Sequence, residues 1–199
     1  MNKTEYNLLF TAALTPEVVH LKPSKYILID KQVLAESSEA LLALKPLYML
    51  CEKALTSLEE QETNSTINPL EGIWSFIDKN IGVRQPSNII GNLMIKQSDN
   101  LSDEEFEGYK NELTAKHQNE DFIEYLQEAK LVTVDEGVNI KMLHIGPYSK
   151  EQSTFDTMEV FAKNKGLKRK YDNHRETYLK DLRTVKADKF ETILKFQVM

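Results

Sequence analysis

The chain carries Pro69-Leu70-Glu71-Gly72-Ile73-Trp74 in its first half and His174-Arg175-Glu176-Thr177-Tyr178-Leu179 in its second, and these two stretches are the strongest indication of its fold. Each reads as a strand with a glutamate and, close behind it, an aromatic residue. Each is followed by a closing apolar strand, Asn92-Leu93-Met94-Ile95-Lys96-Gln97 in the first half and Thr192-Ile193-Leu194-Lys195-Phe196-Gln197-Val198 in the second. The repeat predicts two similar half-domains. Carboxylates on matching strands would face the groove between the halves, where acids beside aromatic rings favour flat, apolar or cationic organic molecules.

The composition is that of an ordinary globular protein. The chain has 199 residues, of which 41% are hydrophobic and 28% charged, enough to bury a core. The formal net charge of −6 argues against nucleic acid as a partner, because phosphate binding needs clustered Lys and Arg. We expect a single domain over residues 1–199, with module one at about 20–100, linking helices at about 101–130 and module two at about 131–199.

The sequence offers little sign of a membrane, a secretory route or a cofactor. No stretch approaches the roughly 20 apolar residues of a membrane span, and the N-terminus lacks a signal-peptide pattern, so a cytoplasmic location is expected. The one cysteine, Cys51, lies within an apolar helical pattern and is predicted to be a core residue. The four histidines show no metal-ligand spacing and there is no glycine-rich phosphate loop, so neither a metal nor another cofactor is expected.

The first half predicts strand, helix, strand, strand. Tyr26-Ile27-Leu28-Ile29 is typical of a buried strand. A helix capped by Ser37 or Ser38 follows, with apolar residues at helical spacing from Leu41 to Leu58, and Pro46 should kink or split it. The strands around 71–76 and 93–96 complete the module.

The second half predicts the same order after two linking helices. Ser102-Asp103-Glu104-Glu105 is a capping box that opens the first of these helices. Asp135-Glu136-Gly137 has turn chemistry between apolar runs at 131–134 and 138–145, which predicts a hairpin. A helix from Ser153 should end at Gly166, and the strands with Glu176 and Ile193 follow. The fold class is α+β, with two pseudo-symmetric modules, an antiparallel sheet and a ligand cleft between the modules.

Several of these segments together resemble the GyrI-like (gyrase-inhibitor-like) small-molecule-binding family, in its stand-alone branch. The resemblance is carried in the expected order from about Tyr26 to the C-terminus by Pro69-Leu70-Glu71-Gly72-Ile73-Trp74, Leu93-Met94-Ile95-Lys96-Gln97, Leu143-His144-Ile145-Gly146-Pro147-Tyr148, the Glu-x-Tyr-Leu segment from Glu176 to Leu179, and the Lys-x-x-Thr-Ile-Leu ending from Lys189 to Leu194. It implies a tandem of strand-helix-strand-strand modules related by a pseudo-two-fold axis. The chain departs from the family at Ile89 and Gly91, where stand-alone members usually carry tryptophans.

The resemblance implies two kinds of activity. Members fused to DNA-binding domains sense drugs and other cationic or aromatic ligands, whereas some stand-alone members resemble hydrolases that open the strained cyclopropane of DNA-alkylating natural products. The leading interpretation for this chain is binding of hydrophobic aromatic or cationic small molecules, drug-like or toxin-like, with cyclopropanoid hydrolysis as an added capacity. The alternative is a non-catalytic sensor or partner-binding protein.

Strand alternation places His174, Glu176 and Tyr178 on one face of their strand. In an apolar cleft, such a carboxyl can hold a cation or, when ionised, take a proton from water. Glu176 is therefore the first candidate for a catalytic base and Glu71, across the groove, is the second. Tyr178, Tyr148, Trp74 and His174 are the candidate ligand-binding residues.

Each candidate also has a purely structural interpretation. Glu176 would then be an exposed edge-strand residue paired with Arg175 or Lys180. Glu71 would belong to a capped turn after Pro69. Trp74 lies opposite Glu71 by alternation, which favours a core role unless a bulge at Gly72 rotates it, and Tyr148 would pack over the next helix.

Overall fold

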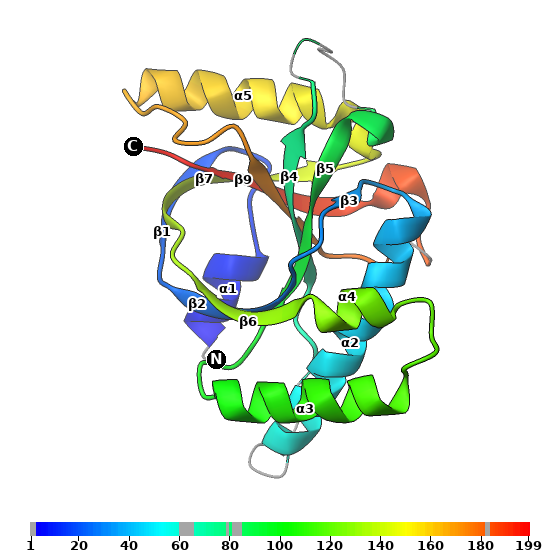
Figure 1. Ribbon diagram of the computed structural model, residues 1–199. Coiled ribbons are helices and arrows are strands. Elements are labelled where there is room, and N and C mark those ends of the chain that lie inside the picture. Colours follow the sequence, from blue (N-terminus) through cyan, green and yellow to red (C-terminus); the bar gives the residue numbers. More distant parts are fainter. Residues whose placement is uncertain (1–2, 60–65, 79, 81–84, 182–183) are drawn as a thin grey trace.

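The computed structural model describes residues 3–59, 66–78, 80, 85–181 and 184–199, which form one antiparallel sheet and five α-helices (Figure 1). The helices are α1 (Lys3–Phe10), α2 (Ser38–Glu59), α3 (Asp103–Lys116), α4 (Ile123–Gln127) and α5 (Glu151–Asn164). The strands are β1 (Glu17–Leu21), β2 (Ser24–Ile29), β3 (Val33–Leu34), β4 (Leu70–Phe76), β5 (Ile89–Lys96), β6 (Ala129–Val134), β7 (Gly137–Ile145), β8 (His174–Tyr178) and β9 (Glu191–Gln197). The predicted α+β class is confirmed.

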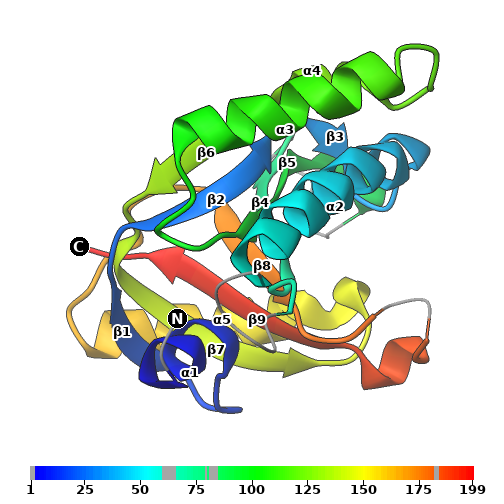
Figure 2. The same cartoon turned by 90° about the horizontal axis from the view of Figure 1, so that it is seen from below.

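The predicted repeat of strand, helix, strand, strand is also confirmed. The first module consists of β2, α2, β4 and β5, and the second of β7, α5, β8 and β9. The sheet order is β1-β7-β9-β8-β4-β5-β2-β6, with β3 paired to β5. The two modules therefore meet where β4 pairs with β8, and each module continues outward in the same order, as a pseudo-two-fold relation requires. Figure 2 shows this central strand pair between the two module helices.

The outer strands make the sheet curl on itself. The ladder of β1 with β7 aligns Glu17 with Lys141, and the ladder of β2 with β6 continues in the same register, aligning Ser24 with Val134. The predicted hairpin of β6 with β7 is therefore wrong. Gly137, at a φ of 57°, lets the chain bend where a turn was expected, and the two strands satisfy their backbone groups against β2 and β1 instead.

Both module helices pack on the same face of the sheet. One core lies under α2 and a second, smaller core lies under α5. Helix α2 runs without a break through Pro46, so of the two predicted effects of this proline, a kink or a split, the split is wrong. An internal proline costs about 3 kcal/mol or more, but the fully buried Ala43, Leu47 and Leu50 on the same helix supply a compensating apolar face.

Local signals at other helix ends are confirmed except at the start of α5, which begins at Glu151, two residues before the predicted cap at Ser153. Ser102 and Glu105 form the complete capping box at the start of α3, and Ser37 caps α2 by accepting a hydrogen bond from the Ala40 amide. Gly166, at a φ of 70°, follows the end of α5. Cys51 is buried in the core under α2, and burial raises the pKa of its thiol to about 12. No described helix is long and apolar enough to cross a bilayer.

Helix α1 lies inside the curve of β1, β2, β6 and β7, on the sheet face opposite to α2 and α5 (Figure 1). Its residues Leu9 and Phe10 pack against Val19 and Leu21 of β1. The Lys141 ammonium group donates hydrogen bonds to the Leu8 and Thr11 carbonyls at the end of the helix, both at 2.7 Å. A cation at the C-terminal end of a helix is favoured by the helix dipole, so the Lys141 contact helps to hold α1 on the sheet. The N-terminal segment thereby covers the inner face of the curled sheet.

Candidate functional site

The Glu176 carboxylate lies at the centre of a hydrogen-bonded cluster on the helix-covered face of β8. Its Oε1 lies 3.0 Å from His174 Nε2, and its Oε2 accepts a hydrogen bond from the Tyr178 hydroxyl at 2.8 Å. The Glu176 side chain is fully buried, His174 is buried and Tyr178 is half-buried. Strand alternation was therefore a correct guide to these three side chains, which share one face as predicted.

Trp74 extends the cluster across the junction of the two modules. Its indole Nε1 donates a hydrogen bond to the Tyr178 hydroxyl at 2.8 Å. The register aligns Gly72 of β4 with Glu176 of β8, and the β4 ladder has no bulge, so simple alternation puts Trp74 on the Glu176 face. The indole also contributes to the core under α2, so its core role and its place beside Glu176 coincide.

Two glycines make room for the indole. A Cβ atom on Gly72 would lie 2.2 Å from the Trp74 Nε1, and a Cβ atom on Gly91 would lie 2.7 Å from Trp74 Cε3 and 1.9 Å from the Ile73 carbonyl oxygen. The glycine at position 91, where the resemblance would have placed a tryptophan, is thus required in this chain by the close approach of both the Ile73 backbone and the Trp74 ring.

Replacing Gly72 with Ala is expected to push the indole away from the Tyr178 hydroxyl and to lower the free energy of unfolding by about 1–3 kcal/mol, the usual cost of overpacking. Trp74 is the only tryptophan, so its fluorescence spectrum reports the displacement directly. The control is Gly108→Ala in α3, where the added methyl meets nothing within 4 Å and should stabilise the helix by about 1 kcal/mol. An unchanged emission spectrum in Gly72→Ala would contradict the packing described.

Aromatic rings from module two complete the surroundings of Glu176. The Tyr148 ring meets the Tyr178 ring edge-on at 5.9 Å between centroids and lies 5.4 Å from the Phe190 ring. On the other side, Phe155 of α5 meets the His174 ring edge-on at 4.7 Å. The predicted ligand-binding side chains Tyr178, Tyr148, Trp74 and His174 therefore lie together around one carboxylate.

Glu71 does not join this cluster, which corrects the expectation that both carboxylates face one groove. The register aligns Glu71 with Thr177 and Gly72 with Glu176, so the two glutamates lie on opposite faces of the sheet. Glu71 therefore lies one position before the residue of β4 that pairs with Glu176. Because successive side chains of a strand point to opposite faces of the sheet, this one position is enough to separate the two glutamates. The structural interpretation of Glu176 is also wrong, since β8 is a central strand and Arg175 points to the opposite face.

The Glu71 side chain forms a buried ion-pair network on the inner face of the curled sheet. Its Oε2 lies 3.0 Å from the Lys195 ammonium and 3.4 Å from Arg175 Nη1, and it accepts a hydrogen bond from the Thr177 hydroxyl at 3.2 Å. A second acid, Glu136, lies 2.5 Å from Arg175 Nη1 and 3.5 Å from the Lys195 ammonium. These two acids and two cations balance each other in charge.

The network shifts the ionisation of its members. Burial by itself would raise the pKa of Glu71, but Lys195 and Arg175 outweigh burial and hold that pKa below its ordinary value. Burial would likewise lower the pKa of Arg175, and Glu136 and Glu71 reverse that shift. Burial and then Glu71 raise the pKa of the Tyr26 hydroxyl, which accepts a hydrogen bond from Arg175. Glu71 is thus an ionised member of a neutralised interior network, which is a structural arrangement.

Nothing in the sequence directly indicated that Glu136, Lys195 or Tyr26 belong to this network. Glu136 was assigned only to a turn, and Lys195 only to a closing apolar strand. A lysine inside a continuous apolar strand was the available signal, because a fully buried ammonium group requires an anionic partner. Within the described residues, no group of three or more His, Cys, Asp or Glu side chains is arranged to hold a metal ion.

Comparison with known proteins supports the fold. No protein-family model matches the sequence, and no curated protein matches it significantly. An uncharacterized conserved protein from Listeria innocua is 24% identical, with a TM-score of 0.85 over 99% of this chain and 98% of that chain. A hydrolase from Listeria innocua is 22% identical, with a TM-score of 0.82 over 99% and 98% of the two chains.

A more distant similarity links the fold to a domain of a larger protein. The EcmrR C-terminal domain is 10% identical, with a TM-score of 0.54 over 93% of this chain and 97% of that domain. At these identities the similarities establish a shared fold that covers nearly the whole of this chain.

Proposed function

We propose that this protein binds cationic or aromatic small molecules against the Glu176 cluster, as a member of the GyrI-like family. The observation that supports the proposal is one fully buried carboxylate with Trp74, Tyr148 and Tyr178 around it at the junction of the two modules. A carboxylate attracts a cation, and the faces of aromatic rings attract it further. Tyr178 is the half-buried member of the cluster, so a ligand approaches Glu176 past its ring.

We propose hydrolysis of strained, electrophilic cyclopropanes as an added capacity of the same site. Glu176 would take a proton from water while the water oxygen forms a bond to a ring carbon. The ring carbon–carbon bond breaks, and its electron pair moves to an attached electron-withdrawing group, which then gains a proton. His174 and the Tyr178 hydroxyl, both in contact with the carboxylate, would hold it in position for the proton transfer.

One consideration favours each side of this second proposal. The Listeria innocua hydrolase has the same fold, which is consistent with catalysis by this chain. The alternative is a sensor or partner-binding protein that returns its ligand intact, and it requires only the binding features of the cluster. Product analysis separates the two, because only hydrolysis adds water to the ligand.

The binding proposal is tested with two planar dyes of similar shape, one cationic and one neutral. Glu176→Gln is expected to weaken the cationic dye roughly tenfold to a hundredfold more than the neutral one, because a charge-assisted contact contributes about 1.5–3 kcal/mol. Fluorescence titration gives both dissociation constants. Glu104→Gln is the matched control, since it removes the same charge from an exposed position at the start of α3. Equal losses for both dyes would place Glu176 outside the site.

A further inference from the structure

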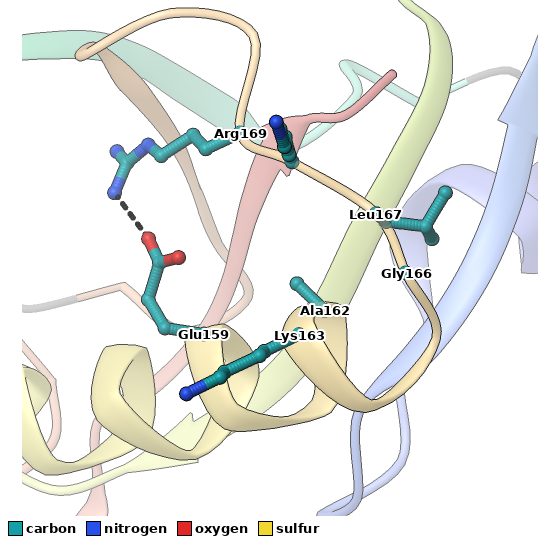
Figure 3. A pocket seen from close by; sticks show the side chains of 7 residues that line it. Glu159, Ala162, Lys163, Gly166, Leu167 and Arg169 are labelled. Atoms are coloured by element: carbon teal, nitrogen blue, oxygen red, sulfur yellow. Dashed lines mark hydrogen bonds and ion pairs between the residues drawn. The ribbon is translucent and has the colours of Figure 1, made fainter.

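Arg169 connects three parts of module two through a single guanidinium group. The residue follows α5, and its backbone is fixed by a β-bridge to Val198 at the C-terminal end of the sheet. The guanidinium lies 4.7 Å from the Phe196 ring of β9 and 5.9 Å from the Phe155 ring of α5. Its Nη1 pairs with Glu159 of α5 at 3.1 Å, an interaction visible in Figure 3.

The Nε and Nη2 donors of the guanidinium bind the segment that leads into β8. Nε donates to the Tyr171 carbonyl at 2.9 Å, and Nη2 donates to the carbonyls of Asp172 and Asn173 at 3.2 and 3.0 Å. These are the three residues immediately before His174. A planar fork with fixed donors can hold three successive carbonyls in one geometry, which the single ammonium group of a lysine cannot do.

This contact continues to the Glu176 cluster through packed side chains. Phe155 lies beside the guanidinium of Arg169 and meets the His174 ring at 4.7 Å. His174 Nε2 in turn lies 3.0 Å from the Glu176 carboxylate. The orientation of the His174 ring is therefore determined at its backbone by the carbonyls that Arg169 binds and at its face by the phenylalanine that packs against Arg169.

We propose that Arg169 is a positioning residue for the His174–Glu176 pair. It touches neither side chain and acts by fixing the entry of β8 and the packing of Phe155. The assignment of a role in ligand binding rests on the function proposed above, whereas the effect on His174 does not. Arg169 also lines a pocket of about 400 Å³ with Lys163 and Lys168, and these neighbouring lysines provide matched controls.

The variants separate the fork from the charge. Arg169→Lys keeps the positive charge and loses the fork, and Arg169→Ala loses both. Lys163→Ala removes a charge from the same pocket. Glu159→Gln removes the ion pair but leaves the three carbonyl contacts in place.

The first measurement is the NMR signal of the His174 ring in the full-length protein, with the ring of exposed His20 as the internal reference. Both Arg169 variants are expected to move the His174 signal, while Lys163→Ala and Glu159→Gln leave it in place. The second measurement is the affinity for the cationic dye, which both Arg169 variants should lower by roughly 2- to 30-fold, the range found for residues that act through a packed network.

The outcomes decide the proposal independently of ligand binding. A wild-type His174 signal in Arg169→Lys would show that the fork is not required and would overturn it. Equal shifts in all four variants, which change the charge in different directions, would show a general disturbance of this surface and not a loss of the fork. A lower melting temperature with an unmoved His174 signal would assign a merely structural role to Arg169. Both outcomes overturn the proposal as well. If the wild-type protein binds no dye, the proposed function fails, but the His174 signal still decides whether Arg169 positions the pair.

Discussion

Replacing Glu71 with Ala is expected to lower the free energy of unfolding at neutral pH by about 3–5 kcal/mol, the range found when one partner of a buried ion pair is removed. The substitution leaves Lys195 and Arg175, which are 1% and 6% exposed, with Glu136 as their anionic partner in the network. Two buried cations then share one acid. Urea denaturation followed by far-UV circular dichroism measures the change.

Two further variants test the cause. Glu104→Ala removes an exposed glutamate and should change stability by no more than about 0.5 kcal/mol. The double variant Glu71→Met with Lys195→Met removes one acid and one cation, so Arg175 and Glu136 remain as a balanced pair 2.5 Å apart. It should recover much of the stability lost in Glu71→Ala. The charge-balance explanation would be contradicted if the double variant lost more free energy of unfolding than Glu71→Met and Lys195→Met lose together.

The pH dependence follows from the lowered pKa of Glu71. A carboxyl whose pKa is lower in the folded than in the unfolded protein contributes stability that is fully present above its ordinary pKa of 4.5. That contribution is lost as the pH falls through the folded-state value. The stability difference between the wild-type protein and Glu71→Gln should therefore be largest near neutral pH and should shrink below about pH 4.5. A difference that stays constant down to pH 3 would show that Glu71 has no lowered pKa.

Replacing Glu176 with Gln is expected to reduce turnover of a cyclopropane-containing alkylating agent by roughly 10²- to 10⁴-fold, the usual contribution of a general base. Gln keeps the shape of the side chain and removes the base, so the rate should fall far more than the affinity for the neutral substrate. Mass spectrometry detects the product as the substrate plus one water. Arg175, the neighbour of Glu176, points to the other face of the sheet, so its loss would not remove the base.

Glu71→Gln is the informative comparison for the same assay. The sequence made Glu71 the second candidate for the base, across the groove from Glu176, but the two glutamates lie on opposite faces of the sheet. Glu71→Gln should therefore lower stability while the turnover of the folded fraction stays near that of the wild-type protein. If the wild-type protein binds the compound and yields no product above the buffer control, hydrolysis is excluded for this substrate class and the binding-module alternative takes its place.

The sequence predicted the parts of this protein that depend on neighbours along the chain. Strand alternation has a period of two, and it placed His174, Glu176 and Tyr178 on one face without any knowledge of the partner strands. The capping box at Ser102 and the stop at Gly166 are also local, because their hydrogen bonds join residues a few positions apart. The order of elements in each half was predictable for the same reason.

Which residues lie opposite one another depends on the pairing of strands that are distant in the sequence, and it becomes visible only in the folded sheet. Thr177 donates to Glu71 across 106 positions of sequence, and the register that brings them together is set by pairing across the whole sheet. An offset of one residue in that register separated the two glutamates, assigning Glu176 to the aromatic cluster and Glu71 to the interior ion pairs. The turn residues before β7 likewise marked a change of direction but did not specify a reversal, because the partner of a strand is chosen by distant backbone groups that become available only in the folded sheet.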